Sequence, residues 1–296
     1  MPHSGGPSPS AASHGTASPP PRFSIVTPSF NQSAWLQLCV ASVADQDVAK
    51  EHIVQDAGST DGTLDWLAAD QRVIAMVEKD RGMYDAINRG LRKARGPLLA
   101  YLNCDEQYLP GALAMVQAHF DRHPETDVLF ADAVVVDTDG QYLWHRKVQV
   151  PGRWHTALFP LSTLTCATFF RRRVVEELGV WFDPEWRYCG DSVWVRALLR
   201  AGVRMAALGR FTSVFTHTGE NLSLRPEVGA EAARYYAEAP AWSRGCRPVV
   251  LAHHRMRRWL AGGYRQAPFQ FSLFTPSQPT RRTERTVEQP TSRWHW

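Results

Sequence analysis

Short apolar runs alternate along the chain with stretches of helical periodicity, and this alternation predicts strands and helices in turn. Ordered structure is expected from Phe23 onward, where an apolar, β-rich run is followed closely by Pro and Asn residues. The predicted strands are FSIVTPSF, HIVQD, residues 73–77 and LLAYLNCDE, and the predicted helices between them are residues 34–43, LDWLAA and residues 84–94.

The next segment predicts a small antiparallel addition. Pro110 is expected to open a helix in its first turn, where the missing N–H costs least. Beyond it, DVLFADAVVVD and QYLWHRK are joined by residues 138–140 in the manner of a hairpin. Strands alternating with helices imply an α/β fold with a mostly parallel sheet flanked by helices. Ligands of such sheets bind beyond the carboxyl ends of the strands.

Composition fits one large α/β domain with additions. Hydrophobic residues make up 44% of the 296 residues and charged residues 21%, and no apolar run approaches the length of a membrane span. Residues 1–21 are rich in Pro, Ser and Gly, so we expect a disordered leader and no secretory signal. The five cysteines show no CxxC pair, which favours a reducing compartment, and we expect a cytoplasmic protein.

The net charge of +4 hides an asymmetry between the body and the tail. Residues 243–296 contain ten Arg, no Lys and two Glu, a balance of +8, which leaves the rest of the chain at about −4. Within this tail, LAHHRMRRWLAGGYR is a short basic amphipathic stretch. It could rest on anionic lipid or pack as a solvated helix against the domain.

QDAGSTDGT, directly after a predicted strand, is the first candidate site. Asp56 stands at the strand end, where it could accept hydrogen bonds from a base or ribose, and Ser59 can cap the next helix. A capped turn without a ligand explains the same residues.

NCDE is the second candidate. Asp105 and Glu106 place two hard oxygen ligands at a sheet edge, as Mg²⁺ or Mn²⁺ bridging two phosphates requires. A solvated loop is the alternative.

Two helix starts carry further candidates. Asp85, Asn88 and Arg89 share one side of the helix after Arg81, so Arg81 or Asp85 could reach a diphosphate, or the residues could form a local polar face. Asp191 opens another helix, where it could be a cap or a general base that deprotonates a hydroxyl.

Taken together and in this order, the motifs resemble the family-2 glycosyltransferases, which are inverting enzymes of the GT-A fold. The resemblance covers about residues 23–223, and MYDAINRG followed by LNCDE is its most specific part. The motifs that carry it are IVTPSFNQ, HIVQDAGSTDGT, EKDRGMYDAINRGLRKARG, LNCDEQYLP, ATFFRRRVVEELG and GDSVWVRALLRAG.

The resemblance implies a direct displacement at the anomeric carbon of a nucleoside-diphosphate sugar, with Mn²⁺ or Mg²⁺ as cofactor. Asp191 would be the catalytic base, and Asp105, Glu106 and His217 the metal-side residues. The implied nucleotide-sugar contacts are Thr27, Asn31, Asp56, Ser59, Arg81, Asp85, Asn88 and Asp105. By family frequency the nucleotide would be UDP, and the pathway bacterial polysaccharide biosynthesis.

Three departures from the family pattern concern the site. The acidic pair of the second motif reads Asp56-Ala57, the metal motif ends in Asp105-Glu106 where two Asp are common, and Thr165-Cys166 stands where His-Gln is frequent. The first two keep open a nucleotide-sugar-binding module without activity. A sugar-1-phosphate nucleotidyltransferase ranks last, because no Gly-rich basic loop follows the first strand.

We expect residues 1–21 to be a leader, 22–224 the transferase domain, 225–275 a helical basic extension and 276–296 a disordered tail. The expected partners are the nucleoside-diphosphate sugar and a glycan or lipid-linked acceptor, with peripheral membrane contact through the basic segment and no nucleic acid.

Overall fold

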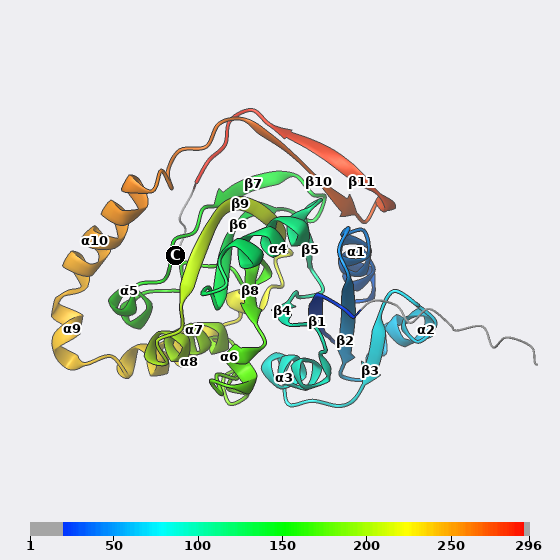
Figure 1. The fold of residues 1–296 in the computed structure, drawn as a ribbon, viewed down its shortest axis with the longest axis horizontal. Coiled ribbons are helices and arrows are strands. Elements are labelled where there is room, and N and C mark those ends of the chain that lie inside the picture. Colours follow the sequence, from blue (N-terminus) through cyan, green and yellow to red (C-terminus); the bar gives the residue numbers. More distant parts are fainter. Residues whose placement is uncertain (1–19, 293–296) are drawn as a thin grey trace, which may run out of the picture.

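The structure is a computed structural model that describes residues 20–292, so the predicted leader lies almost wholly outside the described residues. Within that range, nine strands form one curled sheet in the order β3-β2-β1-β4-β8-β6-β9-β5, with β7 beside β6 (Figure 1). The strands are β1 (Phe23–Ser29), β2 (Lys50–Asp56), β3 (Ile74–Val77), β4 (Leu98–Tyr101), β5 (Glu106–Tyr108), β6 (Val128–Val136), β7 (Tyr142–Arg146), β8 (Thr168–Arg171) and β9 (Met205–Thr216).

Helices flank this sheet, as the alternating pattern predicts. They are α1 (Ser33–Ala44), α2 (Thr63–Leu67), α3 (Met83–Lys93), α4 (Ala112–Arg122), α5 (Arg153–Leu158), α6 (Arg173–Glu176), α7 (Gly190–Arg200), α8 (Val228–Ala237), α9 (Ala241–Gly245) and α10 (Arg247–Leu260), with 3₁₀ turns η1 (Thr165–Ala167) and η2 (Leu222–Leu224). None of the helices within residues 20–292 is both long enough and apolar enough to cross a membrane.

The first four strands of the sheet order, β3, β2, β1 and β4, are parallel to one another, and β8 then pairs antiparallel with both β4 and β6. The predicted hairpin is present, because β6 and β7 pair antiparallel. LLAYLNCDE, expected as one strand, is divided into β4 and β5 by a turn at the acids. The helix expected at Pro110 begins at Ala112, after Gly111 in a left-handed conformation.

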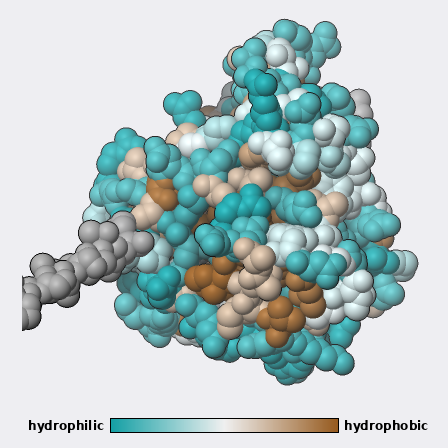
Figure 2. Space-filling view, turned by 90° about the vertical axis from the view of Figure 1, so that its right-hand side faces the viewer, coloured by the Kyte–Doolittle hydropathy of each residue, from teal (hydrophilic) through white to brown (hydrophobic). Residues whose placement is uncertain are grey.

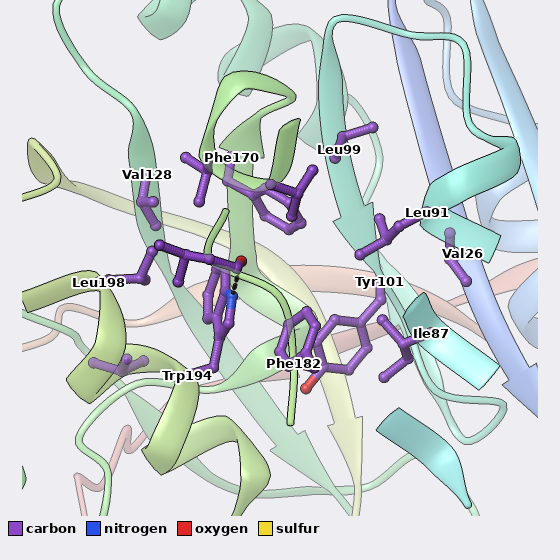
Figure 3. Close-up of a cluster of buried hydrophobic side chains, with 14 of the residues drawn as sticks. Val26, Ile87, Leu91, Leu99, Tyr101, Val128, Phe170, Phe182, Trp194 and Leu198 are labelled. Carbon is purple, nitrogen blue, oxygen red and sulfur yellow. Dashed lines mark hydrogen bonds between the residues drawn. The ribbon is translucent and has the colours of Figure 1, made fainter. Parts of the chain in front are cut away.

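Two apolar cores lie on opposite faces of the sheet. Side chains alternate across a strand, so Val26 joins one core and Ile25 the other. Figure 3 shows the first core, in which Trp194 of α7 and Ile87 of α3 reach in from the helices around Phe182. This core fixes α3 and α7 against one sheet, and both helices begin at candidate site residues.

The tail prediction is wrong for residues 278–287, which form a strand. β11 (Gln278–Val287) pairs antiparallel with β10 (Phe269–Thr275), and this hairpin runs beside α1 and β5 (Figure 1). Leu273 packs with Val134 and Val214 of the main sheet. The Arg282 guanidinium hydrogen-bonds both the Asp45 carboxylate and the Tyr108 carbonyl. The buried side chains of this hairpin come mainly from β10, whereas most side chains of β11 are polar and exposed. The Arg-rich sequence of β11 therefore resembles that of a disordered segment.

The edge strand β3 exposes Ile74 and Val77, whose side chains are 40% and 50% exposed. Figure 2 shows the side of the molecule on which β3 and α2 lie, and a group of apolar side chains is visible on this face. β3, with the sequence IAMV, carries no charged side chain.

Candidate active site

The candidate site lies where β1, β2 and β4 end. These strands are parallel neighbours, and the register pairs Ser29, the last residue of β1, with Asp56, the last of β2. The Cys104 thiol, just beyond β4, donates to the Pro28 carbonyl at 3.3 Å. The three predicted loops therefore meet at one edge of the sheet.

Asp56 is fully buried, and both oxygens of its carboxylate are engaged. Its Oδ2 accepts the hydroxyls of Ser29 and Ser59 at 2.7 Å, and its Oδ1 accepts the N–H groups of Gly58 and Ser59 at 2.9 and 2.7 Å. This is the capped turn that the sequence offers as the alternative to a nucleotide contact. A direct base contact by Asp56 requires at least one of these four bonds to break.

Asn31 joins the two loops. Its backbone is left-handed, with φ of 51°, a conformation that Asn tolerates better than most residues. Its Oδ1 accepts the Thr60 N–H and its own N–H donates to Ser59 Oγ, both at 2.8 Å. Thr27 lies beneath them, fully buried, with its hydroxyl hydrogen-bonded to His52 at 2.8 Å. Asn31 and Ser59 therefore shape the loop surface, whereas Thr27 lies inside the sheet.

Among the predicted contacts at the start of α3, one side chain is exposed and others are bonded within the protein. Asp85 accepts the Arg81 backbone N–H at 3.1 Å and the Arg89 Nε–H at 3.2 Å, while the Arg81 side chain is 72% exposed. Asn88 is buried, and its amide exchanges two hydrogen bonds with the backbone of Phe182, at 2.7 and 3.2 Å. Arg81 can therefore reach an anionic ligand, whereas the polar atoms of Asn88 are occupied by protein.

Asp80 is a site residue that the sequence interpretation did not single out. Burial raises the pKa of its carboxyl, and the nearby charges of Asp85 and Asp56 also raise it. We call Asp56, Asp80 and Asp85 the nucleotide-side carboxylates. The signal in the sequence was an acid immediately before Arg81 and Gly82 at a helix start.

The acidic pair after β4 points in two directions. Asp105 is half-buried, and its Oδ2 accepts the Asn221 Nδ2–H at 2.9 Å. Glu106 begins β5 and is fully buried; its Oε2 accepts the Asn103 N–H at 2.8 Å, and its Oε1 has no partner among the described residues. Burial raises the pKa of Asp105 to about 6 and that of Glu106 to about 8, and the Asp105 charge raises the latter further.

The loop after β9 closes over Asp105. Asn221 bridges the Asp105 carboxylate and the Thr216 carbonyl, so this loop is tied to the acidic pair. His217 lies at the start of the loop, where its N–H donates to the Val136 carbonyl and its ring meets Trp144 edge-on at 6.0 Å. Asn221 is a second residue absent from the sequence prediction, since nothing in ENLS marks an amide as a partner for a distant acid.

A divalent cation fits this edge if phosphates supply most of its ligands. Among residues 20–292, no three His, Cys, Asp or Glu side chains form a cluster able to hold a metal, so Asp105, Glu106 and His217 do not make a complete protein site. Mg²⁺ usually keeps waters and binds through one or two carboxylates plus substrate phosphates. Asp105, which is partly exposed and whose Oδ2 accepts the Asn221 amide N–H, suits that mode.

Asp191 lies in the first turn of α7, one residue inside the helix and not at the expected cap. The helix begins at Gly190, and Asp191 Oδ1 accepts the Ser192 N–H at 2.7 Å. The Asp191 N–H donates to the Tyr84 hydroxyl at 3.0 Å. Only glycine fits beside that ring, because a Cβ on Gly190 would lie 2.4 Å from Tyr84 Cε2. Burial raises the pKa of the Asp191 carboxyl to about 6.

Glu231 of α8 holds the loop that leads into α7. Its carboxylate accepts the N–H groups of Arg187, Tyr188 and Cys189 at 2.6 to 2.7 Å. Its charge also raises the pKa of Asp191, after the larger effect of burial. Glu231 lies beyond the segment in which we looked for catalytic residues, and no sequence motif links it to residues 187–189.

The acidic pair and Asp191 influence one another. The charge of Asp191 contributes to raising the pKa of Glu106, and it opposes the lowering of the Arg146 pKa to about 10 by burial. We call Asp105, Glu106 and Asp191 the reaction-side carboxylates. Arg146 of β7 keeps its charge at neutral pH, and Asp191 is the member of this group whose charge acts on it.

Comparison with known proteins supports the resemblance. A PGL/p-HBAD biosynthesis glycosyltransferase of Mycobacterium bovis is 32% identical over 166 residues, which are 54% of this chain and 62% of that protein. A putative teichuronic acid biosynthesis glycosyltransferase of Bacillus subtilis, TuaG, is 35% identical over 94 residues, 30% of this chain and 37% of that one. The chain thus spans less than two thirds of the length of these relatives.

Solved structures share the fold at low identity. S. aureus TarS 1-349 in complex with UDP-GlcNAc matches with a TM-score of 0.58 and 21% identity, covering 73% of this chain and 65% of that one. The mannosyltransferase PcManGT from Pyrobaculum calidifontis, in complex with GDP-Man and Mn²⁺, matches with a TM-score of 0.51 and 15% identity, covering 82% and 81%. These neighbours confirm the predicted GT-A type of sheet.

The family model for glycosyl transferase family 2 matches residues 24–179, more than half of the chain. The matched segment contains the nucleotide-side carboxylates and the Asp105-Glu106 pair, whereas Asp191 and Glu231 follow it. On this match, together with the shared sheet and the ordered motifs, the chain belongs to glycosyl transferase family 2.

Proposed function

We propose that this glycosyltransferase moves a sugar from a nucleoside-diphosphate sugar, with UDP as the nucleotide, to a hydroxyl of a glycan or lipid-linked acceptor, and inverts the anomeric configuration. One observation carries the proposal: the partly buried carboxylate of Asp191, whose pKa is raised, is anchored through its backbone N–H to Tyr84 and lies within electrostatic reach of Glu106. A base with a pKa near the working pH combines the correct charge with a strong tendency to accept a proton.

In this scheme Asp191 accepts the proton of the acceptor hydroxyl while the acceptor oxygen attacks the anomeric carbon. The bond to the diphosphate oxygen breaks on the opposite side, so one displacement inverts the configuration. Arg146 and the exposed Arg81 are the cations that this chain can direct toward the leaving diphosphate. Asn31 and Ser59 line the nucleotide-side loop, with Asp80 and Asp85 nearby.

Asp105 would hold Mn²⁺ or Mg²⁺, with Glu106 behind it and the remaining ligands from phosphate and water. When bound, the cation supplies positive charge that offsets the charge developing on the diphosphate. His217 remains a candidate for contact with the diphosphate from the loop after β9. The proposed setting is bacterial polysaccharide biosynthesis, in the cytoplasm and at the inner face of the membrane, in line with biosynthetic relatives such as TuaG.

The direct test is a thermal-shift panel of UDP, GDP, CDP and dTDP, each with Mn²⁺, Mg²⁺ or EDTA. A ligand that binds the native state raises the melting temperature by mass action. We expect UDP to raise it only with a divalent cation, and Asp105→Asn to remove that dependence. No shift with any nucleotide would contradict a nucleotide-sugar site.

A second candidate is a nucleotide-sugar-binding module without activity. The full engagement of the Asp56 carboxylate and the complete burial of Glu106 favour it, since both acids are withdrawn from a ligand. This candidate predicts the same metal-dependent UDP shift but no release of UDP from UDP-sugars with any acceptor. Measuring UDP release beside the thermal shift therefore separates the two.

A further inference from the structure

Helix α10 packs against the protein with two polar side chains and exposes an apolar side. His254 and Arg258, four residues apart, are buried, at 6% and 3% exposure. On the opposite side Val249, Met256 and Leu260 are 70%, 53% and 69% exposed. The amphipathic character expected from the sequence is present, and His254 and Arg258 face the protein while the apolar side chains face outward.

Partners on α5 and on the loop before it hold the inner face of α10. The His254 ring stacks on His155 of α5, with centroids 3.6 Å apart and an interplanar angle of 16°. The Gln149 amide donates to His254 Nδ1 at 3.0 Å, and the Arg257 guanidinium donates to the Val150 carbonyl at 3.1 Å. These contacts fix the rotation of α10 about its axis, so the outward position of the apolar side is set by specific bonds.

We call Val249, Ala252, Met256, Trp259 and Leu260 the outer stripe of α10; all five side chains are exposed. Their spacings of three and four residues place them along one side of the helix. Trp259 is 64% exposed, and Trp242 of the preceding helix α9 is 63% exposed. In Figure 1, α9 and α10 form the outer margin of the molecule, away from the sheet.

The charge around the stripe has one sign. Residues 241–265 contain six Arg and no Asp or Glu, and Arg244, Arg247 and Arg255 among them are exposed. Arg244 and Arg247 also line a pocket of about 230 Å³ whose other walls include Leu158 and Ala237. An apolar stripe between cations matches a bilayer surface that is apolar within and anionic at its headgroups.

We propose that the outer stripe of α10, with its flanking arginines, docks this protein onto an anionic phospholipid bilayer. A second copy of the chain fits the surface less well. A two-fold pairing of the stripe with itself would bring the same arginines together, and no acid within residues 241–265 could compensate them. Exposed Trp is the residue type favoured at a membrane interface.

The position of the surface links it to the reaction. Helix α5 packs against both α10 and α7, the helix that carries Asp191. A bilayer held at the outer side of α10 therefore has two helices, α10 and α5, between it and α7, the helix that carries the candidate base. This meaning for catalysis rests on the proposed function, whereas binding to the bilayer does not.

The test is flotation of the full chain, without nucleotide, on vesicles of phosphatidylcholine and on vesicles in which about a third of the lipid is phosphatidylglycerol. We expect binding to the anionic vesicles only, reduced about tenfold or more by Met256→Gln with Trp259→Gln. Both replacements are good helix formers on an exposed face, so α10 should persist. Arg255→Glu should weaken binding and make the residual binding less sensitive to salt.

The matched control is Ile74→Thr with Val77→Thr, which removes two exposed apolar side chains from the β3 edge and should leave vesicle binding unchanged. Equal binding by the α10 and β3 variants would overturn the proposal, as would absence of binding by the unaltered protein. A dimer in light scattering that the α10 variant converts to a monomer would assign the stripe to a second copy instead. Retained UDP binding in solution would show that failure here leaves the transferase site intact.

Discussion

The backbone N–H of Asp191 donates a hydrogen bond to the hydroxyl of Tyr84 at 3.0 Å, across two helices that begin at the same side of the sheet. The Tyr84 ring is itself held, because it stacks on Phe182 at 5.8 Å. Phe182 is fixed through its backbone by the Asn88 amide and through its ring by Trp194 at 4.7 Å (Figure 3). Asn88, expected to contact the nucleotide sugar, is thus the start of a chain of contacts that places the candidate base.

Tyr84→Phe removes the acceptor for the Asp191 N–H and keeps the ring that fills the core. We expect kcat to fall by about tenfold or more, because small displacements of a catalytic group are costly, while the Kd for UDP stays unchanged. The measurement is steady-state kinetics beside nucleotide titration. Tyr108→Phe is the matched control, because it removes a buried hydroxyl that has no hydrogen-bond partner among the described residues. Equal kcat values for the two variants would remove Tyr84 as a positioning residue.

Glu231→Gln keeps the size of the side chain but removes the negative charge that accepts hydrogen bonds from three N–H groups. We expect faster hydrogen exchange at residues 187–189 and a lower kcat. If Glu231 only held the loop, no further change would be expected. The Glu231 charge also raises the Asp191 pKa, so its removal should move the acidic limb of the pH–kcat profile to lower pH.

Glu227→Gln is the control for this prediction, since Glu227 is exposed and lies one turn earlier, at the start of the same helix. It should change neither the exchange of residues 187–189 nor the pH profile. An acidic limb that stays in place in Glu231→Gln would leave Glu231 with a loop-holding role alone.

Asp191→Asn tests the base itself. Loss of a general base typically costs about a hundredfold or more in rate, whereas nucleotide affinity should be preserved because a base acts on the acceptor hydroxyl and not on the nucleotide. In the unaltered protein, Asp191 with its pKa near 6 is protonated below that pH and cannot accept a proton. Activity should therefore fall tenfold per pH unit below about 6 and be level above it. A profile that is flat from pH 5 to 8 would speak against Asp191 as the base.

How far the sequence reaches differs between the fold and the site. The order of strands and helices up to β7, apart from β5, follows from apolar periodicity, because each element buries a face whose spacing is visible in the sequence. The strand β11 was missed because Val287 is the one buried residue among its ten, so no apolar period marks it, and it is held by pairing with β10.

For the site, strand-end acids could be found, since a parallel sheet brings them together. Whether each of these polar side chains is free to bind a ligand could not be predicted from the sequence. Asp56 is saturated by two backbone N–H groups and two serine hydroxyls, and Asn88 by the backbone of Phe182, and the positions of these groups depend on the whole fold. Glu231 and Asn221 act on residues more than forty positions away, and no local pattern records such a partner.

Glu106→Gln examines the most deeply buried acid. Its carboxyl has an ordinary value of 4.5 in an unfolded chain and a pKa of about 8 in the fold, because burial and the Asp105 charge disfavour its ionised form. Between these values the native state holds a proton that the unfolded chain has lost. The stability contributed by this proton is complete below about pH 4.5 and is lost as the pH rises through about 8.

Glutamine cannot ionise, so Glu106→Gln should avoid this loss. The melting temperature of the variant relative to the unaltered protein should rise steadily from pH 5 to pH 8.5, by an amount equivalent to roughly 1 kcal/mol or more. Asp139→Asn, an exposed acid in the β6–β7 turn, is the control and should show no such trend. A difference that is constant with pH would mean that Glu106 is ionised in the fold and that its buried charge is matched by a partner. In that case Glu106, and not Asp105 alone, would be available to a divalent cation at neutral pH.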